Sequence, residues 1–306
     1  MTFFSVIISV YNKEKHIQST IESVLHQTFK DFEIIVINDG STDNSEKIIN
    51  AFNDERITLI TTPNQGASNA RNSGIKAAKS DYIALLDGDD TWDSSYLQHM
   101  YDAIQKFPNS KLFSTGLAQK YKDKITPVNY SFIQTETHGL HNYFEASKKY
   151  TLITSSSVVF NTSILEKTGV FDTEIATGED TDLWIRFGLH FSVLFINKPL
   201  ACYNYDDYSL SNTNFDMDKK PKFNQYIEQE KDNSDLKIFL DRNRYSMAIL
   251  SILKNDKKHY KFYVSNLDAT NLSLRQRFLL KSPKWLLLLL LQLQSLRGEW
   301  LIYPKS

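Results

Sequence analysis

The sequence predicts an α/β fold with a mostly parallel central sheet that is flanked by helices. Three observations support this prediction. Short apolar segments alternate with segments of helical periodicity along the first ninety residues, the segment 83–86 is apolar throughout, and polar clusters follow three of the apolar segments. An uninterrupted apolar strand suits a parallel sheet covered on both faces. The alternation favours right-handed βαβ units.

The first elements follow from residue type and spacing. A β-branched run predicts the first strand, and Ile17, Ile21, Val24 and Leu25 recur at helical spacing after it. A dense turn signal at 38–43 ends the second strand and can cap the next helix. We therefore expect strands at 5–10, 32–37, 57–61 and 82–86, separated by helices at 17–25, 46–52 and 67–79.

The later elements are less regular. We expect a helix at 92–107, strands at 111–121, 151–160 and 193–203, and a helix that begins near Glu179. Leu183, Trp184 and Phe187 form the apolar face of that helix, which makes Trp184 a core residue. From about residue 215 the chain becomes helical, so we expect one domain at 1–215 and a helical C-terminal region at 216–306.

The composition excludes several classes of protein. A net charge of −1 gives no reason to expect nucleic-acid binding. The single cysteine, Cys202, excludes an internal disulfide and a cysteine-based zinc cluster and fits a reducing compartment. We see no signal peptide and no window with the roughly 18 apolar residues of a membrane-spanning helix, and we expect a cytoplasmic enzyme.

The segment 82–90 is the most informative part of the chain. Asp87, Asp89 and Asp90 crowd into the four positions after a buried strand, and Gly88 lets the backbone turn tightly among them. Carboxylates that repel one another make sense around a hard divalent cation. The alternative is a solvated acidic loop that caps the next helix.

The polar clusters after the first, second and fourth strands should meet, because ligands of parallel sheets bind beyond the carboxyl ends of the strands. These clusters are Tyr11-Asn12, 39–41 and 87–90. No Gly-x-Gly-x-x-Gly follows the first strand and no Gly-x-x-x-x-Gly-Lys is present, which disfavours a dinucleotide dehydrogenase and a P-loop enzyme.

Six segments together resemble the family-2 inverting glycosyltransferases of the GT-A (Rossmann-like) fold, of the bacterial surface-polysaccharide type. They occur in order and with family-like spacing at 5–12, 23–28, 33–43, 64–74, 87–90 and 178–180. The resemblance covers roughly residues 3–211. It implies a nucleotide-sugar donor, most often a UDP-sugar, and a divalent metal ion, Mn²⁺ or Mg²⁺.

The resemblance also implies a donor site. Tyr11 would lie near the base or ribose, and Asp39 would accept a hydrogen bond from a ring N–H of the base. Arg71 would contact the nucleotide or its diphosphate. Asp87 would reach the ribose or the metal ion, which Asp89 would hold. The donor-binding set implied in this way is Val10, Tyr11, Asn12, Glu14, Asp39, Arg71, Asp87, Gly88 and Asp89.

The catalytic base is expected in the Glu-Asp pair of the sixth segment. An inverting transfer needs a base that takes the proton of the acceptor hydroxyl. The resemblance assigns this role to Asp180, with Glu179 positioning the acceptor. The alternative is that both acids only favour a helix N-terminus, by about 0.3–1 kcal/mol each.

One segment departs from the family pattern. Many relatives read Tyr-Arg-x-His-x-x-Ser-x-Ser after the last strand, whereas here Asn204 takes the place of the Arg and Asp206 that of the His. An aspartate can still bind a hard cation. Asp206 is therefore either a weak metal ligand or has lost that role.

The C-terminal region suggests a contact surface at 271–306. This segment has six Lys or Arg residues and one acid, and Trp285 is followed by six leucines at 286–291. Such a helix suits the surface of the inner membrane, on its cytoplasmic face. The alternatives are a helix that packs on the catalytic domain, or on a second copy in an oligomer.

We expect a metal-dependent glycosyltransferase that moves a hexosyl or N-acetylhexosaminyl group to a glycan or lipid-linked oligosaccharide. A nucleotidyltransferase would need a Gly-rich basic loop after the first strand, where the chain reads Tyr11-Asn12-Lys13-Glu14. A non-catalytic nucleotide-sugar-binding or scaffold protein would predict loss of the carboxylates, and Asp39, Asp87, Asp89 and Asp180 are all present.

Overall fold

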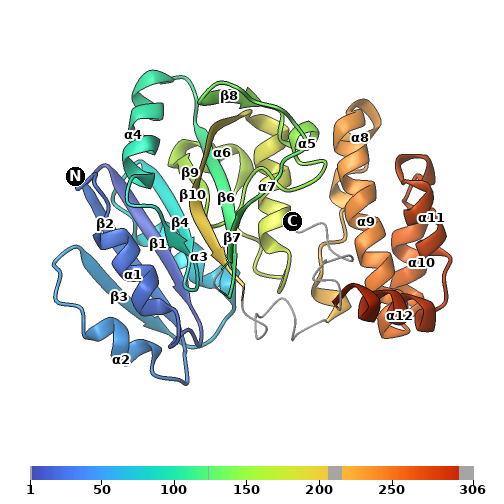
Figure 1. The fold of residues 1–306 in the computed structure, drawn as a ribbon, viewed down its shortest axis with the longest axis horizontal. Helices are drawn as coiled ribbons and strands as arrows, with labels where there is room; N and C mark the ends of the chain where they lie inside the picture. The colour runs from blue at the N-terminus through green and yellow to red at the C-terminus, as the bar shows by residue number, and fades with distance from the viewer. Residues whose placement is uncertain (1, 123, 206–215, 296–306) are drawn as a thin grey trace.

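The computed structural model describes residues 2–122, 124–205 and 216–295 (Figure 1). Its central feature is a sheet with the strand order β3-β2-β1-β4-β9-β6-β10-β5, to which β7 adds beside β6 and β8 beside β10. The strands are β1 (Phe4–Val10), β2 (Phe32–Asp39), β3 (Ile57–Thr62), β4 (Tyr82–Asp87), β5 (Thr91–Trp92), β6 (Leu112–Tyr121), β7 (Lys124–Pro127), β8 (His138–His141), β9 (Val158–Asn161) and β10 (Val193–Asn204).

The main strands share one direction. The pairs β1–β2, β1–β4, β2–β3 and β6–β10 are parallel. Strand β9 lies antiparallel between β4 and β6, so β6 and β10 point the same way as the first four strands. The predicted fold class, a mostly parallel sheet flanked by helices, is confirmed.

Helices cover both faces of the sheet because apolar side chains of the strands point to both. Val6 and Ile8 of β1 join one core with α1 (Ile17–Leu25) and α4 (Tyr96–Lys106). Ile7 joins a second core with α5 (Tyr143–Ala146) and α7 (Glu179–His190). The remaining helices of this part are α2 (Ser45–Asn50), α3 (Ala67–Ala77) and α6 (Leu165–Thr168).

Two sequence expectations need correction. The strand predicted at 151–160 exists only as β9, because the residues before it turn back on themselves: the Thr154 backbone N–H donates to Ser157 Oγ at 3.0 Å. Hydroxyl side chains compete in this way with ladder hydrogen bonds. The helix predicted at 92–107 begins only at Tyr96, because Thr91 and Trp92 pair with β10 as β5.

The C-terminal helices pack against the sheet domain on the side of α7 (Figure 1). They are α8 (Gln229–Asp232), α9 (Ser234–Lys254), α10 (Lys257–Ser265), α11 (Leu274–Leu280) and α12 (Lys284–Ser295). Phe239 of α9 meets the rings of Tyr143 and Phe144, with centroids 5.3 and 5.6 Å apart. The region is helical, as predicted, and shares its core with α5 and α7. The boundary at residue 215 stays a prediction.

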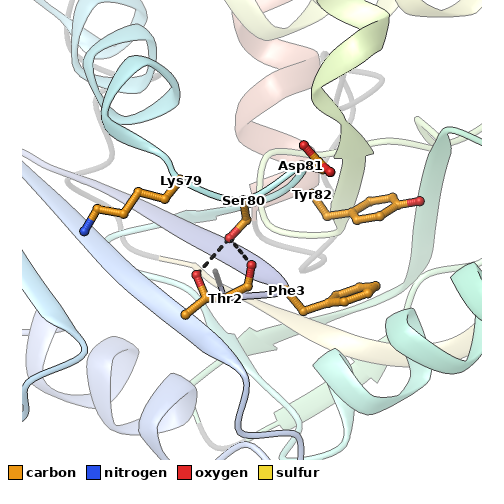
Figure 2. Close-up of a pocket in the computed structure, with 6 residues that line it drawn as sticks. All are labelled: Thr2, Phe3, Lys79, Ser80, Asp81 and Tyr82. Carbon is orange, nitrogen blue, oxygen red and sulfur yellow. Dashed lines mark hydrogen bonds between the residues drawn. The ribbon is translucent and has the colours of Figure 1, made fainter.

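A small hollow of about 120 Å³ lies at the opposite edge of the sheet from residues 87–90, here called the acidic loop (Figure 2). It is formed where β1 and β4 begin, and Ser80 Oγ is engaged there with the hydroxyl and the carbonyl of Thr2, at 3.0 and 2.8 Å. Its size and its engaged polar groups make it a poor ligand site. Within the described ranges, no helix has both the length and the apolar character that crossing a membrane requires.

Candidate functional site

The predicted polar clusters meet at the carboxyl edge of the sheet. In the strand register, Ser9 pairs with Asp87 and Val10 pairs with Asn38. The residues that follow β1, β2 and β4 therefore leave the sheet side by side. This places Tyr11, Asp39 and Asp87 at one edge, as the parallel topology predicts.

Asp39 organises the second of these loops. Its side chain is buried, and its two oxygens accept hydrogen bonds at 2.8 Å from the backbone N–H groups of Gln65 and Gly66. Gly40 has a φ of +69°, and a Cβ there would lie 2.7 Å from the backbone nitrogen of Asn64. Asp39 thus holds the two residues that come directly before α3. Each carboxylate oxygen has a second lone pair for a further donor.

The loop after β1 is bound to the loop after β2. Asn12 Oδ1 accepts from the Thr42 N–H at 2.7 Å, and Glu14 Oε2 accepts from the Asn44 backbone N–H and Nδ2 at 3.0 and 2.8 Å. Val10 is buried, whereas Tyr11 is half-buried. Asn12 and Glu14 therefore hold the two loops together, and their contact with a donor stays a prediction.

The three carboxylates of the acidic loop have different surroundings. Asp90 points inward, where it accepts from Ser156 Oγ at 2.5 Å and from the Asn204 backbone N–H at 3.0 Å. Burial raises the pKa of Asp90 well above its ordinary value, and the charges of Asp89 and Asp87 add to the rise. Asp90 is thus a structural acid, which leaves Asp87 and Asp89 to face a ligand.

Asn204 and Ser156 are residues whose part in the site the sequence did not indicate. Asn204 Nδ2 donates to the backbone carbonyl of Asp89 at 2.7 Å, and the Asp87 backbone N–H donates to Ser156 Oγ at 3.2 Å. The departure from the family pattern at position 204 was the available signal. These contacts fix the acidic loop to the end of β10 and to the turn before β9.

Gly88 is required by close packing between the acidic loop and β1. Its N–H donates to the Ser9 carbonyl at 3.1 Å, and a Cβ on this residue would lie 2.9 Å from the same oxygen. Because the obstructing atom belongs to the backbone, the loop itself would have to move.

Gly88→Ala should therefore destabilise the protein by about 1–3 kcal/mol, as overpacking commonly does, and weaken binding of a nucleoside diphosphate. Urea unfolding and calorimetric titration with UDP measure the two effects. Unchanged stability together with unchanged affinity would contradict the packing argument.

Arg71 of α3 connects the acidic loop to α7. Its side chain is 9% exposed, and it donates to Asp87 Oδ1 at 2.8 Å and to Glu179 Oε1 at 2.7 Å. The guanidinium carbon lies 5.2 Å from the ring centroid of Phe171. One buried cation thus joins two acidic motifs far apart in the sequence. Contact of Arg71 with a diphosphate stays a prediction.

The first turn of α7 contains three acids with separate environments. Glu179 is bound to Arg71, while Asp182 is buried and accepts from Tyr226 Oη at 2.7 Å and from Gln225 Nε2 at 2.8 Å. Asp180 is half-buried and accepts from the Thr181 N–H at 2.6 Å. Burial, together with the charge of Glu179, raises the pKa of Asp180 to about 7. A carboxyl group with that pKa can act as a base near neutral pH. Trp184 is fully buried, as expected for a core residue.

The residues that face the site fit a divalent metal ion held jointly with a ligand. In the described part of the chain no group of three or more His, Cys, Asp or Glu is arranged for a metal ion, and Asp206 lies outside the described residues. Mg²⁺ commonly takes only one or two carboxylates and completes its shell with phosphate and water. Asp87 and Asp89 supply that number, and the ammonium of Lys13 already pairs with Asp89 Oδ2.

Comparison with known proteins identifies the family. Residues 5–169 match the model of "Glycosyl transferase family 2". Glycosyltransferase GlyG of Streptococcus pneumoniae is 30% identical over 227 residues, which are 70% of this chain and 74% of that protein. An uncharacterised glycosyltransferase of Rickettsia typhi, RT0329, is 30% identical over 223 residues, 68% of this chain and 66% of that one. The alignment therefore covers about two thirds of the length of RT0329 and about three quarters of the length of GlyG.

The fold is shared with a solved structure. The crystal structure of S. aureus TarS 1–349 in complex with UDP-GlcNAc superposes with a TM-score of 0.62 at 18% identity, covering 86% of this chain and 91% of that one. The GT-A resemblance drawn from six sequence segments and the family match agree. The chain belongs to glycosyl transferase family 2.

Proposed function

We propose that this protein is a metal-dependent inverting glycosyltransferase that moves a sugar from a UDP-sugar to a hydroxyl group of a glycan or lipid-linked oligosaccharide. The base and ribose of the donor would lie at the edge formed by Val10, Tyr11 and Asp39. The diphosphate would face Asp87 and Asp89. The TarS complex contains UDP-GlcNAc, which supports a uridine nucleotide as the first donor to test.

A Mn²⁺ or Mg²⁺ ion held by Asp87 and Asp89 would neutralise the charge that appears on the leaving nucleoside diphosphate. Neighbouring residues hold the loop that bears these two carboxylates in place. Asn204 fixes the backbone at Asp89, Ser156 fixes the backbone at Asp87, and the inward-pointing Asp90 connects the two.

Asp180 would act as the base. The acceptor oxygen forms a bond to the anomeric carbon while the bond from that carbon to the diphosphate oxygen breaks, and the hydroxyl proton passes to Asp180. A single displacement inverts the anomeric configuration. Glu179, held by Arg71, would position the acceptor beside Asp180.

The observation that carries this proposal is the bridge made by Arg71. Its two ion pairs hold Asp87, in the loop proposed to face the diphosphate, and Glu179, beside the proposed base, on the two terminal nitrogens of one guanidinium. A base and a leaving group must both lie within reach of the transferred sugar. The bridge supports that proximity.

A donor screen tests the proposal. Hydrolysis of several UDP-sugars and other nucleotide-sugars is measured with Mn²⁺, Mg²⁺ or EDTA, with and without a mixture of glycan and lipid-linked acceptors. We expect turnover of one donor that EDTA abolishes. Binding of a donor without turnover under any of these conditions would instead favour a non-catalytic nucleotide-sugar-binding or scaffold protein.

The surface of α11 and α12 supports a lipid-linked acceptor and a place on the cytoplasmic face of the inner membrane. Residues 271–295 include four cations, Arg275, Arg277, Lys281 and Lys284, and no acid. Leu287 is buried against the core, but neighbouring side chains face outward, Trp285 with an exposed fraction of 67%. The large apolar side chains exposed on these two helices are Leu274, Phe278, Trp285, Leu288, Leu289 and Leu293. Exposed apolar side chains and several cations in the same short segment suit anionic lipid.

Vesicles that contain anionic phospholipid should therefore bind the protein at low salt and release it at about 0.5 M salt, where screening is strong.

The double variant Phe278→Ser, Leu289→Ser should bind at least about tenfold more weakly, because each large apolar group contributes about 1.5–3 kcal/mol on burial. The control Ile133→Ser, Leu140→Ser removes two exposed apolar groups elsewhere and should bind as wild type does. Vesicle flotation is the measurement, and equal loss in both variants would contradict the assignment. A stable dimer without vesicle binding would assign the surface to a second copy instead.

A further inference from the structure

Lys13 is a charged residue of the site that the proposed mechanism does not use. It lies in the loop between β1 and α1, and its ammonium pairs with Asp89 Oδ2. The exposed fractions of the two side chains are 17% for Lys13 and 15% for Asp89. The pair is therefore largely shielded from solvent, at the carboxylate that would hold the metal ion.

The backbone of Lys13 and the first carbons of its side chain are held in place by their surroundings. The Lys13 N–H donates to Ser45 Oγ at 2.8 Å, and the Lys13 carbonyl accepts from the N–H groups of His16 and Ile17 at 2.9 Å. A Cβ on Gly88 would lie 3.4 Å from Lys13 Cγ, so the stem of the lysine crosses the acidic loop at that glycine. Only the outer part of the side chain can move without disturbing the loop.

A divalent ion and the Lys13 ammonium compete for Asp89. Two cations on one carboxylate repel each other strongly in a site of low dielectric constant. A metal ion bound by Asp89 would therefore break the Lys13–Asp89 pair. The released ammonium would stay beside the acidic loop, where the diphosphate of the donor would lie.

We propose that Lys13 is a built-in counter-ion of Asp89 that a divalent metal ion displaces, and that the nucleoside diphosphate then takes up the released ammonium. This inference rests on the proposed function and adds a regulatory property to it. The metal ion and the nucleotide should each bind weakly alone and strongly together. The free energy spent in breaking the ion pair is recovered only when phosphate is present to take up the ammonium.

The test is calorimetric titration of the metal-free protein with Mn²⁺, in the absence and the presence of UDP, with Mn²⁺ EPR as a second readout. Lys13→Met should bind Mn²⁺ about tenfold more tightly than wild type without UDP, because the competing charge is gone. The factor by which UDP strengthens Mn²⁺ binding should fall by the same tenfold. Lys13→Arg, which retains the charge, should behave nearly as wild type.

Two controls separate the inference from general effects of charge and from the proposed function. Lys15→Met removes an equal charge from an exposed side chain two residues away and should leave Mn²⁺ affinity within about twofold of wild type, since exposed charges are screened. Asp89→Asn should abolish Mn²⁺ binding. Unchanged Mn²⁺ affinity in Lys13→Met, with binding still lost in Asp89→Asn, overturns the inference and leaves the proposed function in place. Absence of Mn²⁺ binding in wild type, with or without UDP, overturns both the inference and the metal dependence.

Discussion

Asp180→Asn is expected to lower the rate of glycosyl transfer by about 10²–10⁴-fold, the usual contribution of a positioned base. Asparagine keeps the shape of the side chain and can still accept the N–H of Thr181, but it cannot take a proton. Donor affinity should be unchanged, because Asp180 lies on α7 rather than in the loops that would hold the nucleotide. Transfer assays and UDP titration separate the two quantities. Equal activity in the variant would remove Asp180 from the reaction.

The pH dependence of wild-type activity tests the same residue. Burial and the charge of Glu179 raise the pKa of Asp180 to about 7, and only the deprotonated form can act as a base. The transfer rate should therefore rise with pH through about 7 and level off above it. The residual rate of Asp180→Asn should lack this rise.

Stability gives a readout that does not depend on activity. The ordinary pKa of an aspartate is 3.8, so between pH 4 and 7 the folded protein holds a proton at Asp180 that the unfolded chain releases. This group's contribution to the free energy of unfolding therefore decreases as pH rises through that range. Asp180→Asn should unfold at a higher urea concentration than wild type at pH 8, with a smaller difference at pH 5.

Arg71→Met is expected to affect the fold and the reaction together. It leaves the Glu179 carboxylate, 11% exposed, and the Asp87 carboxylate without their shared cation. Removing one partner of a buried ion pair costs about 3–5 kcal/mol. The variant should lose that much stability in urea unfolding. Transfer activity should also fall by at least about tenfold where the variant remains folded, because donor and acceptor sides lose their alignment.

Arg56→Met provides a matched control for this prediction. Arg56 also makes two hydrogen bonds to a carboxylate, that of Asp54, but both side chains are half-buried, at 27% and 25% exposed, whereas Arg71 is 9% exposed. A cation that is more open to water contributes less than a buried one, so Arg56→Met should cost less stability than Arg71→Met and no activity. A loss in Arg71→Met no larger than that in Arg56→Met would show that the bridge contributes nothing specific.

Sequence patterns predicted the fold and the edge at which the site lies, for a clear physical reason. The uninterrupted apolar strand β4 and the alternation of strands with helices leave few arrangements, and parallel topology then brings Tyr11, Asp39 and Asp87 together. Residues 151–157 were misassigned as strand because hydroxyl side chains that bond to their own backbone do not alter the apolar pattern.

The finer chemistry of the site could not be predicted because it depends on contacts across long stretches of sequence. Asp87, Asp89 and Asp90 cannot be told apart by residue type, but only the carboxylate of Asp90 accepts from Ser156 Oγ and points inward. Arg71 and Glu179 are 108 positions apart. The Lys13–Asp89 pair is a similar case, since nothing in the spacing of either residue indicates the other.

The contacts of Asp182 have a consequence for protein engineering. Tyr226 and Gln225 hold this buried carboxylate two residues after Asp180, so the helix that bears the proposed base is seated partly by residues that follow position 215. A chimera that exchanges the C-terminal region between relatives, to redirect acceptor choice, would therefore be better joined after Tyr226 than at 215. Fusion at residue 215 would replace Gln225 and Tyr226 with the partner's residues, so the contacts that seat the helix of the proposed base would change.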